Sequence, residues 1–161
     1  MIDGFYKIND VLSNRERKKL LELCKPLCKE MPGFAAKQSD EFLHMRPRIK
    51  EYIDIFRQKI SNKLSKTIYF NKVWVNEDGG YKKDISWHRH HTELTAVYYM
   101  KTIPIINSGT LFKDEFVRCK QNSILIFPGH IVHGTPAYPF HWIKRYSIAM
   151  DVIDISPNTD I

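Results

Sequence analysis

The feature that most constrains the fold is a series of short β-rich segments that starts at Thr67 and reaches Val152. Turn-forming residues separate these segments, as at Asp78-Gly79-Gly80, Asn107-Ser108-Gly109 and Gln121-Asn122. We expect strands over residues 67–76, 85–90, 94–101, 110–112, 115–118, 123–127, 131–135 and 143–152. About eight short strands at such close spacing are typical of a β-sandwich or a small barrel.

The preceding part of the chain has the apolar periodicity of helices. Ser13 and Glu16 have the spacing of a capping box, which predicts a helix start, and Pro26 predicts a kink or an early end. A second helix is expected to begin near Arg46-Pro47. Its apolar stripe has the 3.6-residue period of a helix face packed on a sheet and comprises Ile49, Tyr52, Ile53, Phe56, Ile60 and Leu64.

The length of the chain, 161 residues, suits one domain with a substantial hydrophobic core. We therefore expect a single domain over residues 1–161, with a helical buttress at 1–66 and a β core at 67–153. Because the helices precede the strands, we expect them to cover one outer face of a sheet. The expected fold class is mainly β with N-terminal helices.

Composition excludes several classes of protein. No apolar run approaches the roughly 18 residues that cross a bilayer, and the first residues lack the pattern of a signal peptide, so a cytoplasmic location is expected. Three cysteines cannot all pair with one another, which argues against a disulfide framework. The formal net charge is +7, but no basic run is interleaved with aromatic residues, so nucleic acid is not expected as the direct target.

Three histidines in two separate segments predict a metal site. His88 and His90 are two residues apart on an extended segment, so their side chains point the same way. His133 follows a Pro-Gly turn and supplies a third imidazole, the ligand that first-row metals bind most often. Arg145 lies twelve residues after His133. Its planar cationic group suits an organic acid bound beside the metal.

Several motifs follow one another in a characteristic order. They are Trp74-x-Asn76, His88-x-His90, Tyr98-Tyr99, Gly109-Thr110-Leu111-Phe112, Phe127-Pro128 to His133-Gly134, and Arg145-x-Ser147. With these motifs the segment from Trp74 to Val152 resembles the iron(II)- and 2-oxoglutarate-dependent oxygenases, in particular small oxygenases of marine bacteria and their phages. The resemblance implies a double-stranded β-helix, or jelly roll, that uses iron(II), 2-oxoglutarate and O2. It also implies hydroxylation of a substrate with release of succinate and CO2.

The same resemblance implies roles for individual residues. His88 would be the first metal ligand and His133 the distal one. Arg145 would pair with the far carboxylate of 2-oxoglutarate, and Ser147 and Tyr99 would hydrogen-bond the same group. Strand parity agrees with this assignment, because Arg145 and Ser147 are two residues apart and share one face of a strand.

The chain departs from the usual pattern at the second metal ligand. Most members have an acidic residue two positions after the first histidine, and this chain has His90. Glu93 is an alternative, since His91-Thr92-Glu93 repeats the usual spacing of a histidine and an acid. We prefer His90, because its register fits the adjoining tryptophan and the distance to the Tyr-Tyr strand. The expected metal ligands are therefore His88, His90 and His133.

Two other functions fit part of the pattern. A cupin-type metal-binding protein would share the histidine spacing but would not require Arg145-x-Ser147, and an inactive jelly-roll binding module would also tolerate a histidine at position 90. The primary substrate is not identified by any motif. The segments 76–86 and 137–142 are expected to border the mouth of the site.

Overall fold

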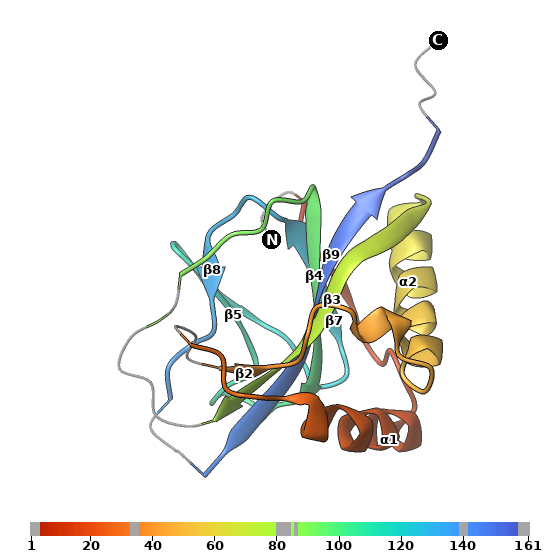
Figure 1. Ribbon diagram of the computed structural model, residues 1–161. Helices are drawn as coiled ribbons and strands as arrows, with labels where there is room; N and C mark the ends of the chain where they lie inside the picture. Colours follow the sequence, from red (N-terminus) through yellow and green to blue (C-terminus); the bar gives the residue numbers. More distant parts are fainter. Residues whose placement is uncertain (1–3, 33–35, 80–84, 86, 139–141, 158–161) are drawn as a thin grey trace.

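The computed structural model describes residues 4–32, 36–79, 85, 87–138 and 142–157 of the chain. The strands form two antiparallel sheets, and the helices lie on the side of the larger sheet that faces away from the smaller one (Figure 1). This arrangement confirms the expected fold class, mainly β with N-terminal helices.

The larger sheet has the strand order β1-β7-β4-β9-β3-β2, and the smaller sheet has the order β6-β5-β8. The strands are β1 (Tyr6–Ile8), β2 (Lys37–Gln38), β3 (Ile68–Gly79), β4 (Leu94–Lys101), β5 (Gly109–Phe112), β6 (Phe116–Arg118), β7 (Ile124–Pro128), β8 (His133–Gly134) and β9 (Lys144–Asp154). The helices are α1 (Asn14–Cys24) and α2 (Lys50–Leu64), with short 3-10 turns η1 (Lys25–Leu27) and η2 (Leu43–Met45).

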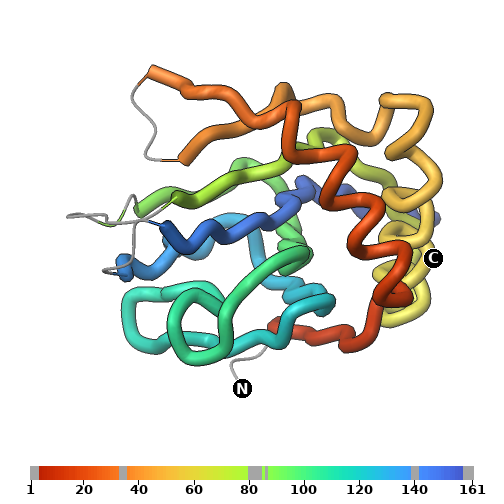
Figure 2. Tube along the Cα trace, turned by 90° about the horizontal axis from the view of Figure 1, so that it is seen from below, coloured from red at the N-terminus to blue at the C-terminus, as the bar shows by residue number. Residues whose placement is uncertain are grey.

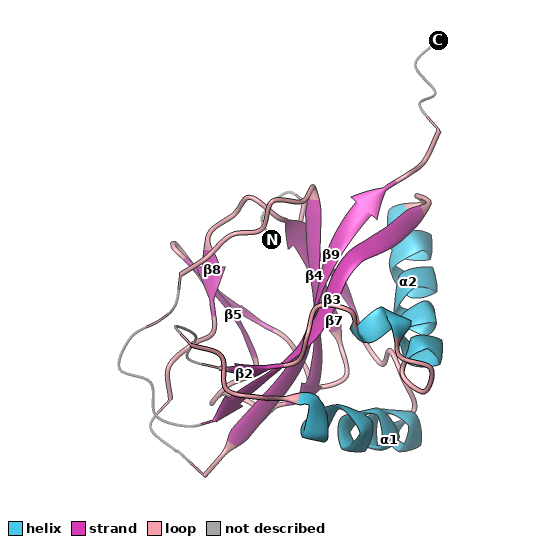
Figure 3. Ribbon diagram, viewed as in Figure 1, coloured by secondary structure: helices cyan, strands magenta, loops and turns pink. Residues whose placement is uncertain are grey.

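Both helices pack on the outer face of the larger sheet, as the sequence predicts (Figure 3). The predicted capping box starts α1: the Glu16 backbone N–H donates to Ser13 Oγ at 3.1 Å, and the Ser13 N–H donates to Glu16 Oε1 at 2.9 Å. The buried residues of α2 are Tyr52, Ile53, Phe56 and Ile60. The Phe56 ring lies 4.5 Å from the Tyr98 ring of β4, between centroids, so the apolar stripe of α2 meets the sheet.

The inner face of the larger sheet carries a second core, which it shares with the smaller sheet. Successive side chains of a strand point to opposite faces, so Tyr98 faces the helices and Tyr99 faces the interior. The buried members of this second core are Phe5, Val97, Tyr99, Phe112, Val117, Cys119, Leu125 and Phe127. On β9, Ser147 pairs with Tyr99 of β4 and with Asn76 of β3. The central strands therefore bring their motifs to one interior space.

The expected helical buttress over residues 1–66 is incomplete, because β1 and β2 also belong to this part of the chain. β1 pairs with β7 and β2 pairs with β3, so the two form the opposite edges of the larger sheet. Figure 2 shows the segment that contains β2 running alongside β3. Strands of two or three residues are too short to show alternation in a sequence.

The expected strand over residues 85–90 is also wrong within the described residues. Only His88 forms a β-bridge there, to His133. The early end expected from Pro26 is confirmed, because α1 stops at Cys24 and Pro26 lies in η1. The other predicted strands are present, although β3 and β9 extend beyond their expected ends to Gly79 and Asp154.

The three cysteines are free, which agrees with the expected lack of a disulfide framework. Cys24 and Cys119 are buried, and burial raises the pKa of the Cys24 thiol to about 12. Neither α1 nor α2, nor either short turn in the described part of the chain, has the length and apolar character needed to span a membrane.

Candidate metal and anion site

A cavity of about 450 Å³ lies between the two sheets. The larger sheet lines it with Trp74, Asn76, Asp78, Val97, Arg145, Ser147 and Ala149. The smaller sheet and the segment before β4 add Thr110, His133, Gly134, Trp87, His88, Arg89 and His90, and the segment around β2 adds Ala36, Gln38 and Glu41. Most of the residues that the sequence singles out therefore face one space.

The three predicted histidines converge in this cavity. The ring nitrogens with which His88, His90 and His133 could bind a metal all lie within 4.8 Å of one another. Their ring centroids are 4.4 Å apart for His88 and His133, 5.4 Å for His88 and His90, and 5.2 Å for His90 and His133. These separations suit three ligands of one ion. Glu93 is exposed and lies outside this cluster.

Backbone hydrogen bonds hold the two histidine segments together. The His88 N–H donates to the His133 carbonyl at 3.0 Å, and the His133 N–H donates to the His88 carbonyl at 2.9 Å. The His90 N–H donates to the Gly129 carbonyl at 2.8 Å, and the Gly129 N–H donates to the Glu93 carbonyl at 3.0 Å. A Cβ at Gly129 would lie only 2.2 Å from the Thr92 carbonyl oxygen, so this close approach requires glycine. We call these four hydrogen bonds the backbone clasp.

Hydrogen bonds orient two of the imidazoles. His133 Nδ1 lies 2.8 Å from the Ile131 carbonyl oxygen, which can only accept, so Nδ1 carries the proton and Nε2 has a free lone pair. His90 Nδ1 lies 2.8 Å from Asp151 Oδ1 and is oriented in the same way. Burial lowers the pKa of His133 to about 3, so this imidazole is neutral at neutral pH. A neutral imidazole is the form that binds metals.

Aromatic rings enclose the same histidines. The Trp74 ring stacks on His90 with centroids 5.5 Å apart and an interplanar angle of 22°. The Phe127 ring meets His133 edge-on at 4.7 Å. These contacts restrict rotation of both imidazoles.

Arg145 is a buried cation in the same cavity. The residue is only 2% exposed. Its Nη1 donates to the carbonyl oxygens of Asn107 and Gly109 at 2.9 and 2.5 Å. Its Nε is buried and has no hydrogen-bond acceptor. Among the described residues, no carboxylate lies within 4.0 Å of its guanidinium. Buried charges are normally paired, so this arrangement suits an anionic ligand.

The other two predicted anion-binding residues lie at different depths. Ser147 lines the cavity on the same face of β9 as Arg145. Tyr99 is fully buried behind Thr110, and the two hydroxyls lie 2.5 Å apart. The Arg145 guanidinium lies 5.2 Å from the centre of the Tyr99 ring. Thr110 lines the cavity, so Tyr99 supports the arginine and reaches the cavity through Thr110.

The sequence matches no protein-family model and no curated protein. Solved structures do match. The viral collagen prolyl hydroxylase of Paramecium Bursaria Chlorella virus-1, in a 2OG complex, is 16% identical with a TM-score of 0.64, covering 93% of this chain and 95% of that one. HygX from Streptomyces hygroscopicus, with nickel and 2-oxoglutarate bound, is 11% identical. The match has a TM-score of 0.70 and covers 97% of this chain and 84% of that one.

An oxidoreductase of the 2OG-Fe(II) oxygenase family from Burkholderia pseudomallei is 9% identical, with a TM-score of 0.69 over 93% of this chain and 84% of that one. The chain has the jelly-roll fold of the iron(II)- and 2-oxoglutarate-dependent oxygenases. The fold expected from the motifs is thereby confirmed. In this oxygenase fold, the three histidines and Arg145 share one cavity between the sheets.

Sequence reasoning missed two residues of the site. Asp151 contacts His90, and Thr110 lines the cavity next to Tyr99. Asp151 has the same parity on β9 as Arg145 and Ser147, so extending that alternation would have pointed to it. Thr110 lies in the Gly109-Thr110-Leu111-Phe112 motif, but the motif gives it no role, because its place beside the cavity depends on the pairing of β5 with β6 and β8.

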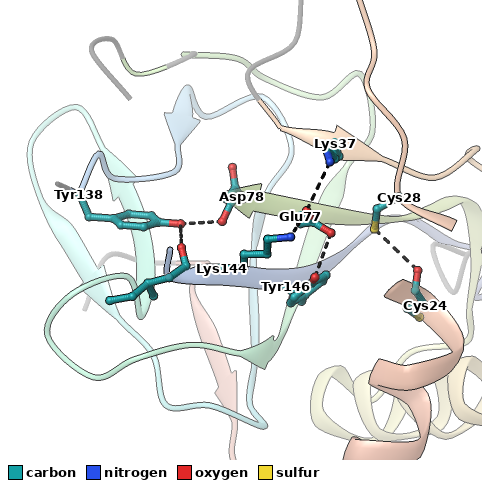
Figure 4. Close-up of polar contacts among 9 residues, drawn as sticks. Cys24, Cys28, Lys37, Glu77, Asp78, Tyr138, Lys144 and Tyr146 are labelled. Carbon is teal, nitrogen blue, oxygen red and sulfur yellow. Dashed lines mark hydrogen bonds and ion pairs between the residues drawn. The ribbon is translucent and has the colours of Figure 1, made fainter. Parts of the chain in front are cut away.

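A charged cluster lies where the C-terminal end of β3 meets the N-terminal end of β9 (Figure 4). The buried Glu77 carboxylate lies 3.3 Å from Lys144 Nζ and 4.0 Å from Lys37 Nζ, and it accepts a hydrogen bond from the Tyr146 hydroxyl at 2.9 Å. Glu77 and Tyr146 alternate with Asp78 and Arg145, so they face away from the cavity. This cluster ties β2, β3 and β9 together at the edge of the sheet.

The expected mouth segments are described only in part. Residues 80–84, 86 and 139–141 lie outside the described residues, whereas Asn76 and Asp78 line the cavity. The Tyr138 hydroxyl lies 2.6 Å from the Asp78 carbonyl oxygen and 3.0 Å from that of Ile143 (Figure 4). Tyr138 therefore joins the second of these segments to the ends of β3 and β9.

Gly109 is the glycine on which the position of Arg145 depends most directly. Its φ is +142°, and a Cβ there would lie 2.2 Å from the Val117 carbonyl oxygen. We expect Gly109→Ala to lower the free energy of unfolding by about 2 kcal/mol or more, since strained backbone and a steric overlap combine. Chemical denaturation of the metal-free protein measures this change.

Gly79→Ala is the matched control for this prediction. Gly79 has no positive φ, and the nearest atom to its added Cβ is Lys144 Cγ at 4.0 Å. Its substitution should change stability by less than about 0.5 kcal/mol. Equal stabilities of the two variants would show that the close approach at Gly109 is not required.

Proposed function

We propose that this protein is an iron(II)- and 2-oxoglutarate-dependent dioxygenase that hydroxylates a substrate and releases succinate and CO2. One observation carries the proposal: a cluster of three convergent histidines shares a cavity with a buried arginine that has no acidic partner among the described residues. The first group of residues fits a divalent metal, and the second fits the carboxylate of an organic acid.

The histidines fit iron(II) in both number and form. His88, His90 and His133 would hold the ion with imidazole nitrogens, and the hydrogen bonds of His90 and His133 direct Nε2 toward the centre of the cluster. Three protein ligands leave coordination positions open for small molecules. Iron(II) with 2-oxoglutarate and O2 would supply the oxidation, in which one oxygen atom enters the substrate and the other enters succinate.

Arg145 fits the distal carboxylate of 2-oxoglutarate. Its Nη1 is occupied by two backbone carbonyls, whereas Nε has no acceptor and Nη2 donates no hydrogen bond to a described residue. The edge formed by Nε and Nη2 can bind the two oxygens of a carboxylate side by side. Ser147 and Thr110 can donate hydroxyl hydrogen bonds to the same anion, and Tyr99 holds Thr110 and stacks on the arginine.

A cupin-type metal-binding protein is the second candidate. The observation that favours it is the all-histidine ligand set, which lacks the carboxylate of the usual facial triad. The buried Arg145 argues against it, because metal binding alone does not account for a buried guanidinium whose Nε lacks an acceptor. The inactive jelly-roll module would require the same histidine cluster to bind no metal.

The first test of the proposal is binding followed by turnover. We expect the nickel-loaded protein to bind 2-oxoglutarate in anaerobic calorimetry, and the metal-free protein to bind it more weakly. The iron-loaded protein should then release succinate in air when pooled peptides, metabolites or oligonucleotides include its substrate. Nickel binding without any binding of 2-oxoglutarate would favour the cupin-type protein, and a lack of metal binding would favour the inactive module.

The identity of the second ligand can be tested separately. We expect His90→Ala to weaken nickel binding by 10-fold or more, a change of about 1.4 kcal/mol or above. Glu93→Ala should leave the affinity nearly unchanged, because Glu93 is exposed and outside the histidine cluster. Calorimetric titration of both variants measures the two affinities. A large loss in Glu93→Ala alone would transfer the ligand role from His90 to Glu93.

A further inference from the structure

Asp151 is a buried residue of β9, and its carboxylate hydrogen-bonds His90, one of the three clustered histidines. Its Oδ1 lies 2.8 Å from His90 Nδ1, and the side chains of Asp151 and His90 are 9% and 8% exposed. Among the described residues, His90 is the only basic side chain within 4.0 Å of this carboxylate. The closest lysine along the strands, Lys72, pairs with Glu41 instead.

Burying a carboxylate is unfavourable unless a partner compensates for its lost hydration. Asp151 lies on the inner side of β9, and the neighbouring strands place Lys72 and Thr95 beside it in the register. If Asp151 served only to stabilise the sheet, its carboxylate would be expected to hydrogen-bond side chains of these neighbouring strands. Among the described residues, the Asp151 side chain instead hydrogen-bonds His90, so the imidazole explains the position of Asp151.

The contact determines which nitrogen of His90 faces the histidine cluster. A carboxylate accepts hydrogen bonds, so Nδ1 carries the proton and the Nε2 lone pair is available. Trp74 stacks on the same ring and limits its rotation. Hydrogen bonds from a ligand histidine to a carboxylate orient the ring and make the imidazole a stronger donor.

We propose that Asp151 is a positioning residue for the metal: it holds His90 as an Nε2 ligand and supplies, one residue removed from the ion, the negative charge that the three imidazoles lack. This inference rests on the proposed metal site and deepens it. The departure at position 90 is then compensated within the chain, because the carboxylate stands behind the second ligand instead of being that ligand.

Two substitutions separate the hydrogen bond from the charge. Asp151→Leu removes the acceptor and the charge at similar size, and it should weaken nickel binding roughly 10- to 100-fold. Asp151→Asn keeps an acceptor oxygen and removes only the charge, so its loss should be smaller than that of Asp151→Leu. Asp154→Asn is the control: Asp154 lies on the same strand but pairs with Lys66, so removing its charge should not change the nickel affinity.

A double-mutant cycle identifies the route through which Asp151 acts. In the His90→Ala background, Asp151→Leu should have almost no further effect on nickel affinity, because Asp151 acts through His90. An equal loss in both backgrounds would overturn the proposal and indicate a general structural role. Thermal unfolding of each metal-free variant shows whether it is folded, and Asp151→Asn carries the test if Asp151→Leu does not fold.

A spectroscopic measurement checks the tautomer directly. In the cobalt-loaded protein, the Nδ1 proton of His90 should give a paramagnetically shifted NMR signal that exchanges slowly with water, since Asp151 holds it in a buried site. Asp151→Leu should remove that signal and retain the one from His133. Wild-type affinity and an unchanged signal in Asp151→Leu would overturn this inference alone, whereas a wild-type protein that binds neither nickel nor cobalt would overturn the proposed function as well.

Discussion

Replacing His133 with alanine should reduce metal binding more than any other single substitution in the cluster. His133 is the most deeply buried of the three histidines, and its ring is fixed by the Ile131 carbonyl and by Phe127. Altering a residue that only supports a ligand commonly costs 10- to 100-fold in affinity, so removing a fixed ligand should cost more than about 100-fold. Nickel titration and iron analysis after anaerobic loading measure the loss.

His130→Ala is the matched control for this experiment. His130 is exposed and lies three residues before His133, outside the cluster. Its substitution should leave the metal content unchanged. His133→Gln, which retains more of the side-chain volume, distinguishes a lost ligand from a cavity in the second core. Undiminished iron loading of folded His133→Ala would remove His133 from the metal site.

The second large effect is expected for 2-oxoglutarate binding by Arg145→Ala. Losing one partner of a charge pair in a buried pocket costs on the order of 2 to 5 kcal/mol, so the dissociation constant should rise roughly 30-fold or more. Arg145→Lys should recover only part of the affinity, because an ammonium group keeps the charge and lacks the planar pair of donors. Anaerobic calorimetry with the nickel-loaded protein measures all three affinities.

Arg118 provides the control for the arginine experiment. It is an exposed arginine of β6 that lies over the Phe116 ring, away from the cavity. Arg118→Ala should bind 2-oxoglutarate as tightly as the wild-type protein does. An unchanged affinity in Arg145→Ala, with nickel binding intact, would contradict the assigned role and favour the cupin-type candidate.

The parts of the fold that the sequence predicts are those with a strong local pattern. The capping box at Ser13, the stripe on α2 and the strand over 94–101 depend on residues that are neighbours in the sequence, and all three are confirmed. The shared face of Arg145 and Ser147 follows from alternation along one strand and is present as well.

The features that were missed depend on contacts between distant residues. β1 and β2 are edge strands of three and two residues, which exist because β7 and β3 offer free edges. The pairing of Asp151 with His90 joins β9 to a segment without regular structure. Alternation along β9 indicates which face Asp151 lies on, but it does not identify His90 as the partner. The bridge between His88 and His133 likewise replaces an expected strand with a single paired residue.

The backbone clasp makes metal binding a property of the whole fold. It joins the segment before β4 to the turn after β7 and to His133 of β8, and β4 and β7 pair with each other in the larger sheet. The clasp therefore depends on pairing between strands that are distant in the sequence, and so does the assembly of the histidine cluster. An ion bound only to the native state would accordingly stabilise the entire β core by mass action, instead of stiffening one loop.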